Sequence, residues 1–403
     1  MRFLLLKGAS QYGSLRLHVD QLAAALSRSG DDAVVLDLLN TDETLQLNAG
    51  LIASFDCVFC FNGLFAPENG AALAALGVTY ATMFVDHPAH HLARLQTPQP
   101  GYLAFFLDRT HVSFMERLTG PEPFALLAFC PPGANIAPMS GAARSFQERD
   151  IDILFSGTYR GAPARPWADM PSPVGPILAE AAERMAADSA LPLLDALDAS
   201  APRFGVQPSA ALVQALGPVL AAVQSFAEAY HRDAFVHAVG AAGVPLTLTG
   251  VGWTKVLEAY PSFAFLGEGS FAETLGLLAR TRIAVNVNNG FVCGGHERVF
   301  AAMAAGAAVF SETSGFYDEA FVDGRDYRAF SRPGARETAD ALLGLLAAPA
   351  TQERLALNGV QRIDEAHLWR HRAGVIRAAV AHARAGSGAT GAAPARTPAK
   401  PPG

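Results

Sequence analysis

The chain has 403 residues, enough for about two domains at roughly 150 residues each. Hydrophobic residues make up 51% and charged residues 17%, which allows a sizeable core and excludes global disorder. A formal net charge of −7, without a stripe of Lys and Arg, argues against nucleic-acid binding.

The start of the chain and its cysteines favour a cytoplasmic protein. The apolar stretch MRFLLL is about one strand long and lacks the features of a signal peptide. No run of about 20 apolar residues predicts a transmembrane segment. The four cysteines are scattered, so we expect no disulfides and a reducing compartment. Cys57 and Cys60 form a C-x-x-C in an apolar strand pattern, where residues three apart point to opposite faces; we interpret both as core residues.

Strand and helix patterns alternate in the first half, which favours an α/β fold with parallel sheets. The expected strands are 2–6, 33–38, 56–61, 79–85, 102–106 and 125–129, and the expected helices are 15–28, 44–53 and 69–76. We expect an N-terminal Rossmann-like domain at 1–135 and a polar linker at 136–149.

The second half continues the alternation. Its expected strands are 151–156, 245–249, 263–266, 283–287 and 307–310, and its expected helices are 271–279, 336–347, 351–357 and 364–385. We expect a C-terminal Rossmann-like domain at 150–366, with a helical insertion at about 174–240 whose apolar periodicity indicates packing. Residues 386–403 are Gly-, Ala- and Pro-rich and are expected to be a disordered tail.

One segment, 281–312, combines a buried strand, an Asn- and Gly-rich loop, a small-residue helix and a second strand. Gly294 and Gly295 stand directly before the helix, where bare backbone amides and the positive end of a helix dipole suit a phosphate. Gly306 follows the helix in the position typical of a C-terminal stop.

The second half shows an ordered series of motifs. A strand ends in SGTYRG, another in TGVGW, and FLGEGSFAETLGLLARTRIAVNVN, GGHERVFAAMAAGAAVFSE and FYDEAFVDGRDYRAF follow. This series resembles the nucleotide-binding half of GT-B glycosyltransferases, and most closely the CgeB-like, "glycosyl transferases group 1" type. The resemblance covers about residues 150–370, and the first half only in outline.

The resemblance implies two Rossmann-like domains with parallel sheets facing a central cleft, and a C-terminal helix at 367–385 packing back on the first domain. It implies transfer of a sugar from a nucleoside diphosphate sugar to an acceptor, without a metal or other cofactor. Many related retaining enzymes carry an E-x7-E pair, whose positions fall here on Cys293 and Ala301. Glu297, one helical turn before Ala301, is the candidate substitute.

In GT-B enzymes the leaving diphosphate is stabilised by Arg or Lys and by helix N-termini. We therefore expect Arg160, Lys255 and Arg298 to bind the donor. The full expected donor-binding set is Gly157, Arg160, Gly252, Lys255, Asn288, Gly294, Gly295, His296, Glu297 and Arg298. The alternatives are a structural ion pair for Arg298, a cap of the loop for Asn288, and an exposed turn for His296.

The catalytic base is expected where a strand of the first domain ends, at Asp86 and His87. The alternative is that Asp86 caps a helix starting near Pro88. His87 belongs to an H-x-x-H-H cluster, but no carboxylate pair or cysteine joins it, so we expect no metal site. Gly8, Gln11 and Gly13 lie in the first loop, expected to face the cleft on the acceptor side.

The expected acceptor is a polysaccharide, a lipid-linked intermediate or a protein such as flagellin. Two other functions stay open. One is a GT-B sugar-nucleotide epimerase, which needs acid and base groups around the bound sugar. The other is a non-catalytic binding or scaffold protein, which the absent carboxylate pair favours.

Overall fold

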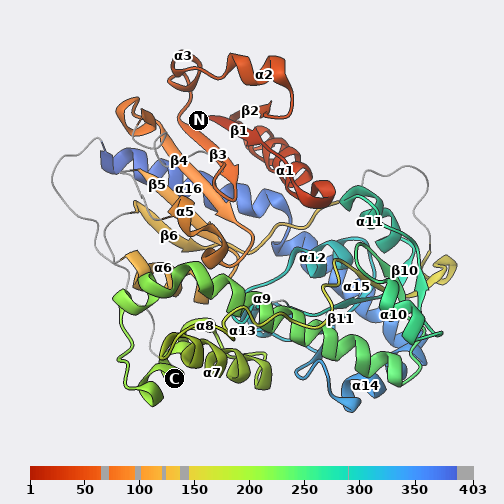
Figure 1. Ribbon diagram of the computed structural model, residues 1–403. Coiled ribbons are helices and arrows are strands. Elements are labelled where there is room, and N and C mark those ends of the chain that lie inside the picture. The colour runs from red at the N-terminus through yellow and green to blue at the C-terminus, as the bar shows by residue number, and fades with distance from the viewer. Residues whose placement is uncertain (65–71, 96–100, 120–123, 137–144, 289, 388–403) are drawn as a thin grey trace.

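The computed structural model describes residues 1–64, 72–95, 101–119, 124–136, 145–288 and 290–387. Within this part, the strands form two six-stranded parallel sheets, one in each half of the chain (Figure 1). The expected α/β architecture of two parallel-sheet halves is therefore confirmed. The expected linker 136–149 lies largely outside the described residues, as does the tail from residue 388 on.

The first sheet has the strand order β2-β1-β3-β4-β5-β6. Its strands are β1 (Arg2–Lys7), β2 (Asp32–Asp37), β3 (Cys57–Phe61), β4 (Thr79–Phe84), β5 (Tyr102–Phe106) and β6 (Leu126–Phe129). Its own helices include α1 (Ser14–Arg28), α2 (Thr41–Gln46), α3 (Ala49–Ile52), α5 (Leu92–Leu95) and α6 (Arg109–Thr119). In β1, Phe3 and Leu5 face one side and Leu4 and Leu6 the other, and all four are fully buried because both faces are covered.

The second sheet has the order β12-β11-β10-β7-β8-β9. Its strands are β7 (Ile151–Ser156), β8 (Thr247–Thr249), β9 (Ala264–Phe265), β10 (Thr281–Asn286), β11 (Ala308–Glu312) and β12 (Arg328–Phe330). The helices that cover it include α10 (Thr254–Ala259), α11 (Phe271–Leu278), α12 (Glu297–Ala304), α13 (Gly315–Ala320), α14 (Arg336–Leu346) and α15 (Pro349–Ala366).

The helical stretch after β7 packs on both halves. It consists of α7 (Val174–Ala187), α8 (Leu193–Ser200) and the 32-residue α9 (Ala210–Ala241). One continuous core joins α7, α8 and the start of α9 to the Leu4 face of the first sheet, while the end of α9 packs on the second sheet through Phe235 and Val239. The opposite face of the first sheet is covered by α1 and by α16 (Trp369–Ser387) (Figure 1).

Several local details differ from the expectations. The single helix expected at 44–53 is two helices, because Asn40 and Asn48 each cap a separate helix start with their side chains. The helices expected at 351–357 and 364–385 are instead α15 and α16, which meet near His367. Neither α6 nor α13 nor the three-residue β12 was expected. Cys57 and Cys60 are buried free thiols on opposite faces of the first sheet, as expected.

No single helix in the described part of the chain is both long and apolar enough to cross a membrane. The two arms of α9, 210–217 and 219–241, are long and apolar enough for a membrane span only when they are taken together, and they meet at a bend of 80°.

Candidate functional site

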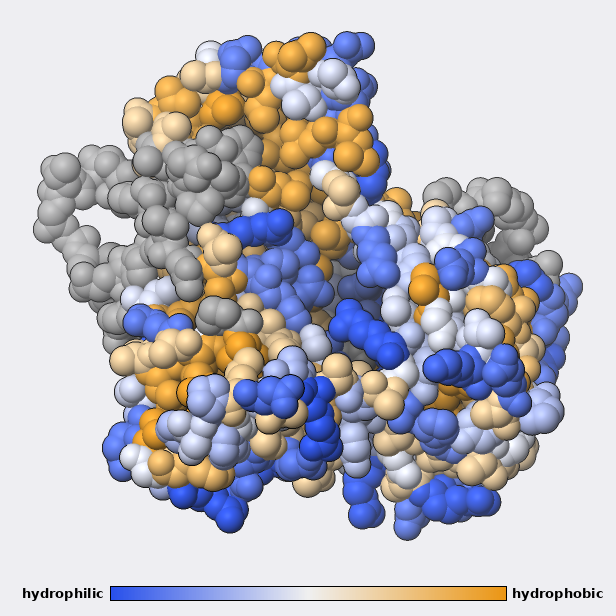
Figure 2. Space-filling view, viewed as in Figure 1, coloured by the Kyte–Doolittle hydropathy of each residue, from blue (hydrophilic) through white to orange (hydrophobic). Residues whose placement is uncertain are grey.

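A cavity of about 510 Å³ lies between the two halves. Its size falls within the roughly 300–1,000 Å³ typical of small-molecule sites. Residues at the carboxyl ends of β1, β4, β7 and β8 line it, together with the start of α12 and the middle of α9. Ligands of parallel α/β sheets bind at this end of the strands. Figure 2 shows hydrophilic residues gathered around the hollow between the halves.

Two glycine-containing loops shape the wall behind β7 and β8. A Cβ on Gly250 would lie 2.3 Å from the carbonyl oxygen of Gly157, and one on Gly252 would lie 2.1 Å from that of Tyr159. Both glycines also have positive φ, at 111° and 92°. Only glycine fits at these points, so Gly252 permits the close approach of the loops and does not line the cavity. Gly157 does line it, and a Cβ on Gly157 would lie 2.9 Å from Nη2 of Arg298.

Among the described residues, three arginines line the cavity: Arg160 after β7, Arg232 on α9 and Arg298 on α12. Arg298 donates from Nη1 to Asn286 Oδ1 at 2.8 Å, and its guanidinium lies 5.8 Å from the ring centre of Phe155. Arg232 donates from Nη1 to the carbonyl of Thr158. Burial and the charges of Arg298 and Arg160 lower the pKa of Arg232 to about 9, so it remains charged at neutral pH. Together, the three guanidinium groups give this part of the cavity a positive charge that would stabilise a bound anion.

His296 is the N-terminal cap of α12. Its Nδ1 accepts the backbone N–H of Arg298 at 3.1 Å, while its own backbone N–H donates to Tyr317 Oη at 2.8 Å. Burial, and then the charges of Arg298 and Arg232, hold the pKa of His296 well below its usual value. The ring is therefore neutral, and because Nδ1 accepts, Nε2 carries the proton and acts as a donor. His296 therefore both caps α12 and lines the cavity.

Two carboxyl groups that line the cavity, those of Glu297 and Glu228, have pKa values near 7. Burial raises the pKa of Glu297 to about 7, against the opposing effect of Arg298. Burial likewise raises the pKa of Glu228 to about 7, although its hydrogen bond with Gln224 and the charge of Arg232 act against it. Both groups exchange a proton in the physiological range, a property that is frequent among acid–base residues.

Asp86 and His87 stand at the end of β4 and both line the cavity. The Asp86 side chain is 55% exposed; its Oδ2 accepts from Asn62 Nδ2 at 3.1 Å and lies 3.4 Å from His91 Nε2. His87, rather than Asp86, caps the short helix that begins at Pro88, because its Nδ1 accepts the N–H of Ala89 at 3.1 Å.

The His87 ring is buried. Its centre lies 4.6 Å from that of His111 and 4.9 Å from that of Phe114. Burial, followed by the charge of His111, keeps its pKa well below the ordinary value. With Nδ1 engaged as an acceptor for the cap, His87 is a neutral structural group on the cavity wall.

The loop after β1 reaches across the cavity. Tyr12, in the left-handed region at φ 60°, places Oη 2.6 Å from Thr158 Oγ1, and Gln11 Nε2 donates to the same oxygen at 3.4 Å. Of the three residues expected here, Gln11 lines the cavity, whereas Gly8 packs near Leu64 and Gly13 precedes α1 with φ 77°. The two halves thus touch directly over the site.

Gly294 and Gly295 lie where the second half packs against Leu107 and Asp108 of the first half. The Gly295 amide donates to Leu107 O at 3.2 Å, and a Cβ on Gly294 would lie 2.1 Å from the same oxygen. Asp108 Oδ2 accepts the N–H of Cys293 at 2.8 Å. The Gly295 amide is therefore already engaged, and neither glycine lines the cavity, contrary to the expectation of bare amides seated for phosphate.

Asn288 and Lys255 lie away from the cavity lining. Asn288 is 4% exposed; its side chain donates to the carbonyls of Glu312 and Thr313 at 3.0 and 2.8 Å, so it fastens β10 to the end of β11. Lys255 is exposed on α10.

The contribution of α9 to the cavity was not predicted, because its apolar periodicity indicates packing. Glu228 and Arg232 stand four residues apart and so share a face of this helix. The signal was present as two charges at helical spacing in a mostly apolar stretch, but nothing indicated that this face meets the cavity. Among the described residues, no group of three or more His, Cys, Asp or Glu side chains is arranged to hold a metal ion.

Residues 232–378 match a family model described as glycosyl transferase-like. No curated protein matches the chain. Sucrose-phosphate synthase from Thermosynechococcus elongatus superposes with a TM-score of 0.57 and 11% identity, over 96% of this chain and 100% of that one.

Two further solved structures resemble the chain over nearly its whole length. A glycosyltransferase from Rickettsia africae gives a TM-score of 0.51 at 10% identity, covering 95% of this chain and 98% of that one. HepE from Anabaena, solved in complex with UDP-glucose, gives 0.50 at 10% identity, over 96% and 100%. The chain therefore has the GT-B fold, and its second half is glycosyltransferase-like in sequence, which confirms the resemblance. The narrower likeness to the CgeB-like group stays a prediction.

Proposed function

We propose that this protein is a glycosyltransferase that takes a sugar from a nucleoside diphosphate sugar, without a metal ion, and passes it to an acceptor. The observation that carries the proposal is the cluster of Arg160, Arg232 and Arg298 in a cavity between two parallel sheets. Guanidinium groups bind phosphate oxygens in a bidentate manner and offset the charge that develops on a leaving diphosphate. The glycosyl transferase-like match over 232–378 includes two of the three arginines and supports this assignment.

In this proposal the donor is held mainly by the second half, through Arg160, Arg232, Arg298 and the Nε2–H of His296. The acceptor enters beside the first half, where the lining residues include Gln11, Asn62 and Asp86. No Lys or Arg from the described part of the first half lines the cavity, so the reacting end of the acceptor is a neutral hydroxyl compound. This favours a glycan or a protein side chain over a lipid-linked phosphate placed directly at the site. The unpaired cysteines support a cytoplasmic location.

The first test is a thermal-shift screen with UDP, GDP, ADP, CDP and dTDP and their hexose derivatives. A ligand present at 100 times its Kd stabilises the folded state by about 2.7 kcal/mol, which raises Tm. UDP and UDP-glucose come first, because HepE with the same fold was solved with UDP-glucose. Arg298→Ala should abolish the shift, whereas Lys255→Ala, on the exposed α10, should keep it. No shift with any nucleotide would overturn the proposal.

Product analysis separates the remaining functions. A transferase should slowly release the nucleoside diphosphate and free sugar, with water as acceptor. Interconversion of two nucleotide sugars without release would identify an epimerase. Binding with neither reaction, even with candidate glycan acceptors, would identify a binding protein.

A further inference from the structure

Tyr12 belongs to the first half of the chain, but its hydroxyl meets the second half at the cavity. Its Oη lies 2.6 Å from Thr158 Oγ1, and Arg232 donates to the backbone carbonyl of the same threonine. Burial lowers the pKa of Arg232, and Tyr12 is among the groups that counter this effect, in agreement with the short separation. Arg298 reaches the same loop, because its Nη2 would lie 2.9 Å from a Cβ on Gly157. The phenol therefore stands among the guanidinium groups of the other half.

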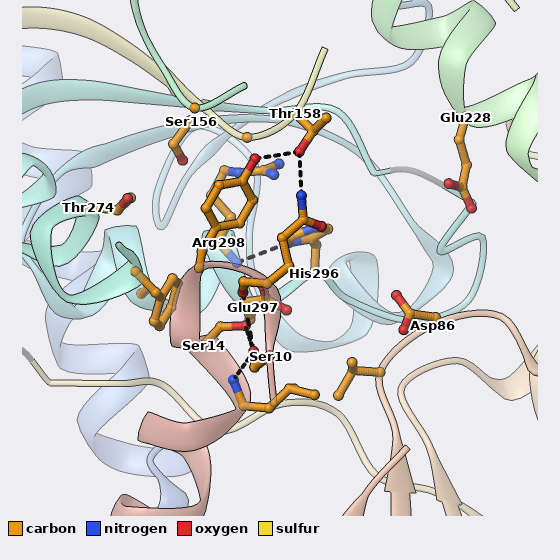
Figure 3. Close-up of a pocket in the computed structure, with 18 of the residues that line it drawn as sticks. Ser10, Ser14, Asp86, Ser156, Thr158, Glu228, Thr274, His296, Glu297 and Arg298 are labelled. Atoms are coloured by element: carbon orange, nitrogen blue, oxygen red, sulfur yellow. Dashed lines mark hydrogen bonds between the residues drawn. The ribbon is translucent and has the colours of Figure 1, made fainter. Parts of the chain in front are cut away.

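The contact between Tyr12 and Thr158 lies away from both ends of the cavity. Figure 3 shows Thr158 and Arg298 in the middle of the view, with Thr274 toward the left and Asp86 toward the right. The volume of about 510 Å³ is free with Tyr12 in this position. The phenol therefore borders the space that a ligand would enter and does not fill it.

The backbone of Tyr12 is in the left-handed region, at φ 60°. Within the described ranges Asn62 is the only other non-glycine residue with positive φ, and it lines the same cavity. This conformation is unfavourable for an aromatic residue and persists only where the surrounding structure fixes it, as happens at functional sites. With Gly13 next at φ 77°, the turn before α1 directs Tyr12 across the cavity to Thr158.

Three side chains form a chain of hydrogen bonds that ends at Tyr12. Gln11 Nε2 can only donate, and it lies 3.4 Å from Thr158 Oγ1. No other partner for the hydroxyls of Thr158 and Tyr12 is found among the residues that the structure describes. Thr158 thus accepts from Gln11 and donates to Tyr12 Oη, which leaves the phenolic O–H free to donate into the cavity. The strongest acceptors that a nucleotide sugar offers beside guanidinium groups are its phosphate oxygens.

Resting on the proposed function, we propose that Tyr12 binds the donor diphosphate from the first half, with its O–H donating to a phosphate oxygen that the arginines hold. Because the three arginines belong to the second half, the diphosphate then contacts both halves at once. A bond to an anion polarises the hydrogen-bond chain behind it, so the bond from Thr158 to Tyr12 strengthens when the diphosphate binds. Donor binding thereby favours the contact between the halves, and departure of the nucleoside diphosphate weakens it.

The test compares Tyr12→Phe with the matched control Tyr230→Phe. Tyr230 lies on α9, is 41% exposed and does not line the cavity. Calorimetry measures the Kd of the nucleoside diphosphate that gives the largest thermal shift, starting with UDP. Tyr12→Phe should raise this Kd by about 10-fold or more, because a hydrogen bond to a charged group is lost. Tyr230→Phe should match the wild type.

A double-mutant cycle with Thr158→Val tests the hydrogen-bond chain. Thr158→Val removes the hydroxyl that supports Tyr12 but leaves the phenol, so it should raise the Kd by less than Tyr12→Phe does. The double variant should bind within about twofold of Tyr12→Phe alone, because both changes break the same chain. Effects that multiply in the double variant would overturn the coupling between Thr158 and the diphosphate.

Two results would overturn the role of Tyr12 while leaving nucleotide binding intact. An unchanged Kd in Tyr12→Phe, even with a lower Tm of the ligand-free protein, would show that the phenol only ties the halves together. Tighter binding in Tyr12→Phe would show that it obstructs the anion. A wild-type protein that binds no nucleoside diphosphate would overturn the proposed function itself.

Discussion

Replacing Glu297 by Gln should stabilise the ligand-free protein at alkaline pH, although it alters the cavity wall. Burial raises the pKa of Glu297 from 4.5 to about 7. Below pH 4.5 the carboxyl is protonated in both the folded and unfolded states and costs nothing. Between pH 4.5 and 7 only the unfolded chain loses the proton, so stability falls as the pH rises. Above pH 7 the full cost is present.

The magnitude follows from the two pKa values. At 1.36 kcal/mol for each of the roughly 2.5 pH units between them, ionised Glu297 costs the folded state at most about 3.4 kcal/mol well above pH 7. A neutral Gln of similar shape avoids this cost. The gain in the free energy of unfolding should therefore approach this limit at pH 8.5 and fall below about 1 kcal/mol at pH 5.

The assay is urea unfolding of the wild type, Glu297→Gln and the exposed control Glu258→Gln at both pH values. The control should change the denaturation midpoint little at either pH. A Glu297→Gln variant no more stable than the wild type at pH 8.5, or equally stabilised at both pH values, would refute the reasoning, because the raised pKa would then have no energetic consequence.

Three other substitutions test separate parts of the structure. Arg232→Met should weaken binding of the nucleoside diphosphate by about 10- to 100-fold in calorimetry, since a hydrogen bond to a charged group contributes about 1.5–3 kcal/mol; an unchanged Kd would exclude Arg232 from the site. Gly250→Ala should lower the free energy of unfolding by more than about 2 kcal/mol, because its Cβ would lie 2.3 Å from the Gly157 carbonyl oxygen. As a control, Gly276→Ala on α11, where a Cβ would meet open space, should raise the free energy of unfolding by about 0.5–1 kcal/mol. Asp108→Ala should cost about 1–3 kcal/mol in urea unfolding, because it leaves the partly buried N–H of Cys293 without its acceptor. A neutral result would show that water replaces the carboxylate.

The strands of both sheets other than β12 could be predicted because each is a short apolar run with turn-forming residues around it. β5 and β7 coincide with their expected ranges, and β3 and β4 fall within a residue of theirs. Those runs also predicted which loops meet at the cleft, so Asp86, Arg160 and Arg298 were found. The three-residue β12 could not be predicted, because its pairing with β11 depends on position in the sheet rather than on its own composition.

The parts of the site that could not be predicted all depend on contacts between distant segments. Two glycines before a helix, such as Gly294 and Gly295, are compatible both with a phosphate-binding loop and with close contact between two segments. Only the position of the Leu107 carbonyl, which accepts the Gly295 N–H, shows that the second interpretation is correct. Glu228 was missed for a related reason. Helical spacing identifies the residues that share a face, but it does not indicate which face of α9 meets the cavity and which meets the first sheet.

The shared core of the first sheet and α7 to α9 determines which segments must be kept together in a chimaera of this protein. The segment 174–227 follows β7 in the chain, yet it covers one face of the first sheet, and α16 shares the other face with α1. A chimaera joined at the linker would take away the segment 174–227 and α16, and would expose residues such as Phe84 and Phe106 to solvent. The smallest unit exchangeable between relatives therefore comprises the first 135 residues together with 174–227 and α16.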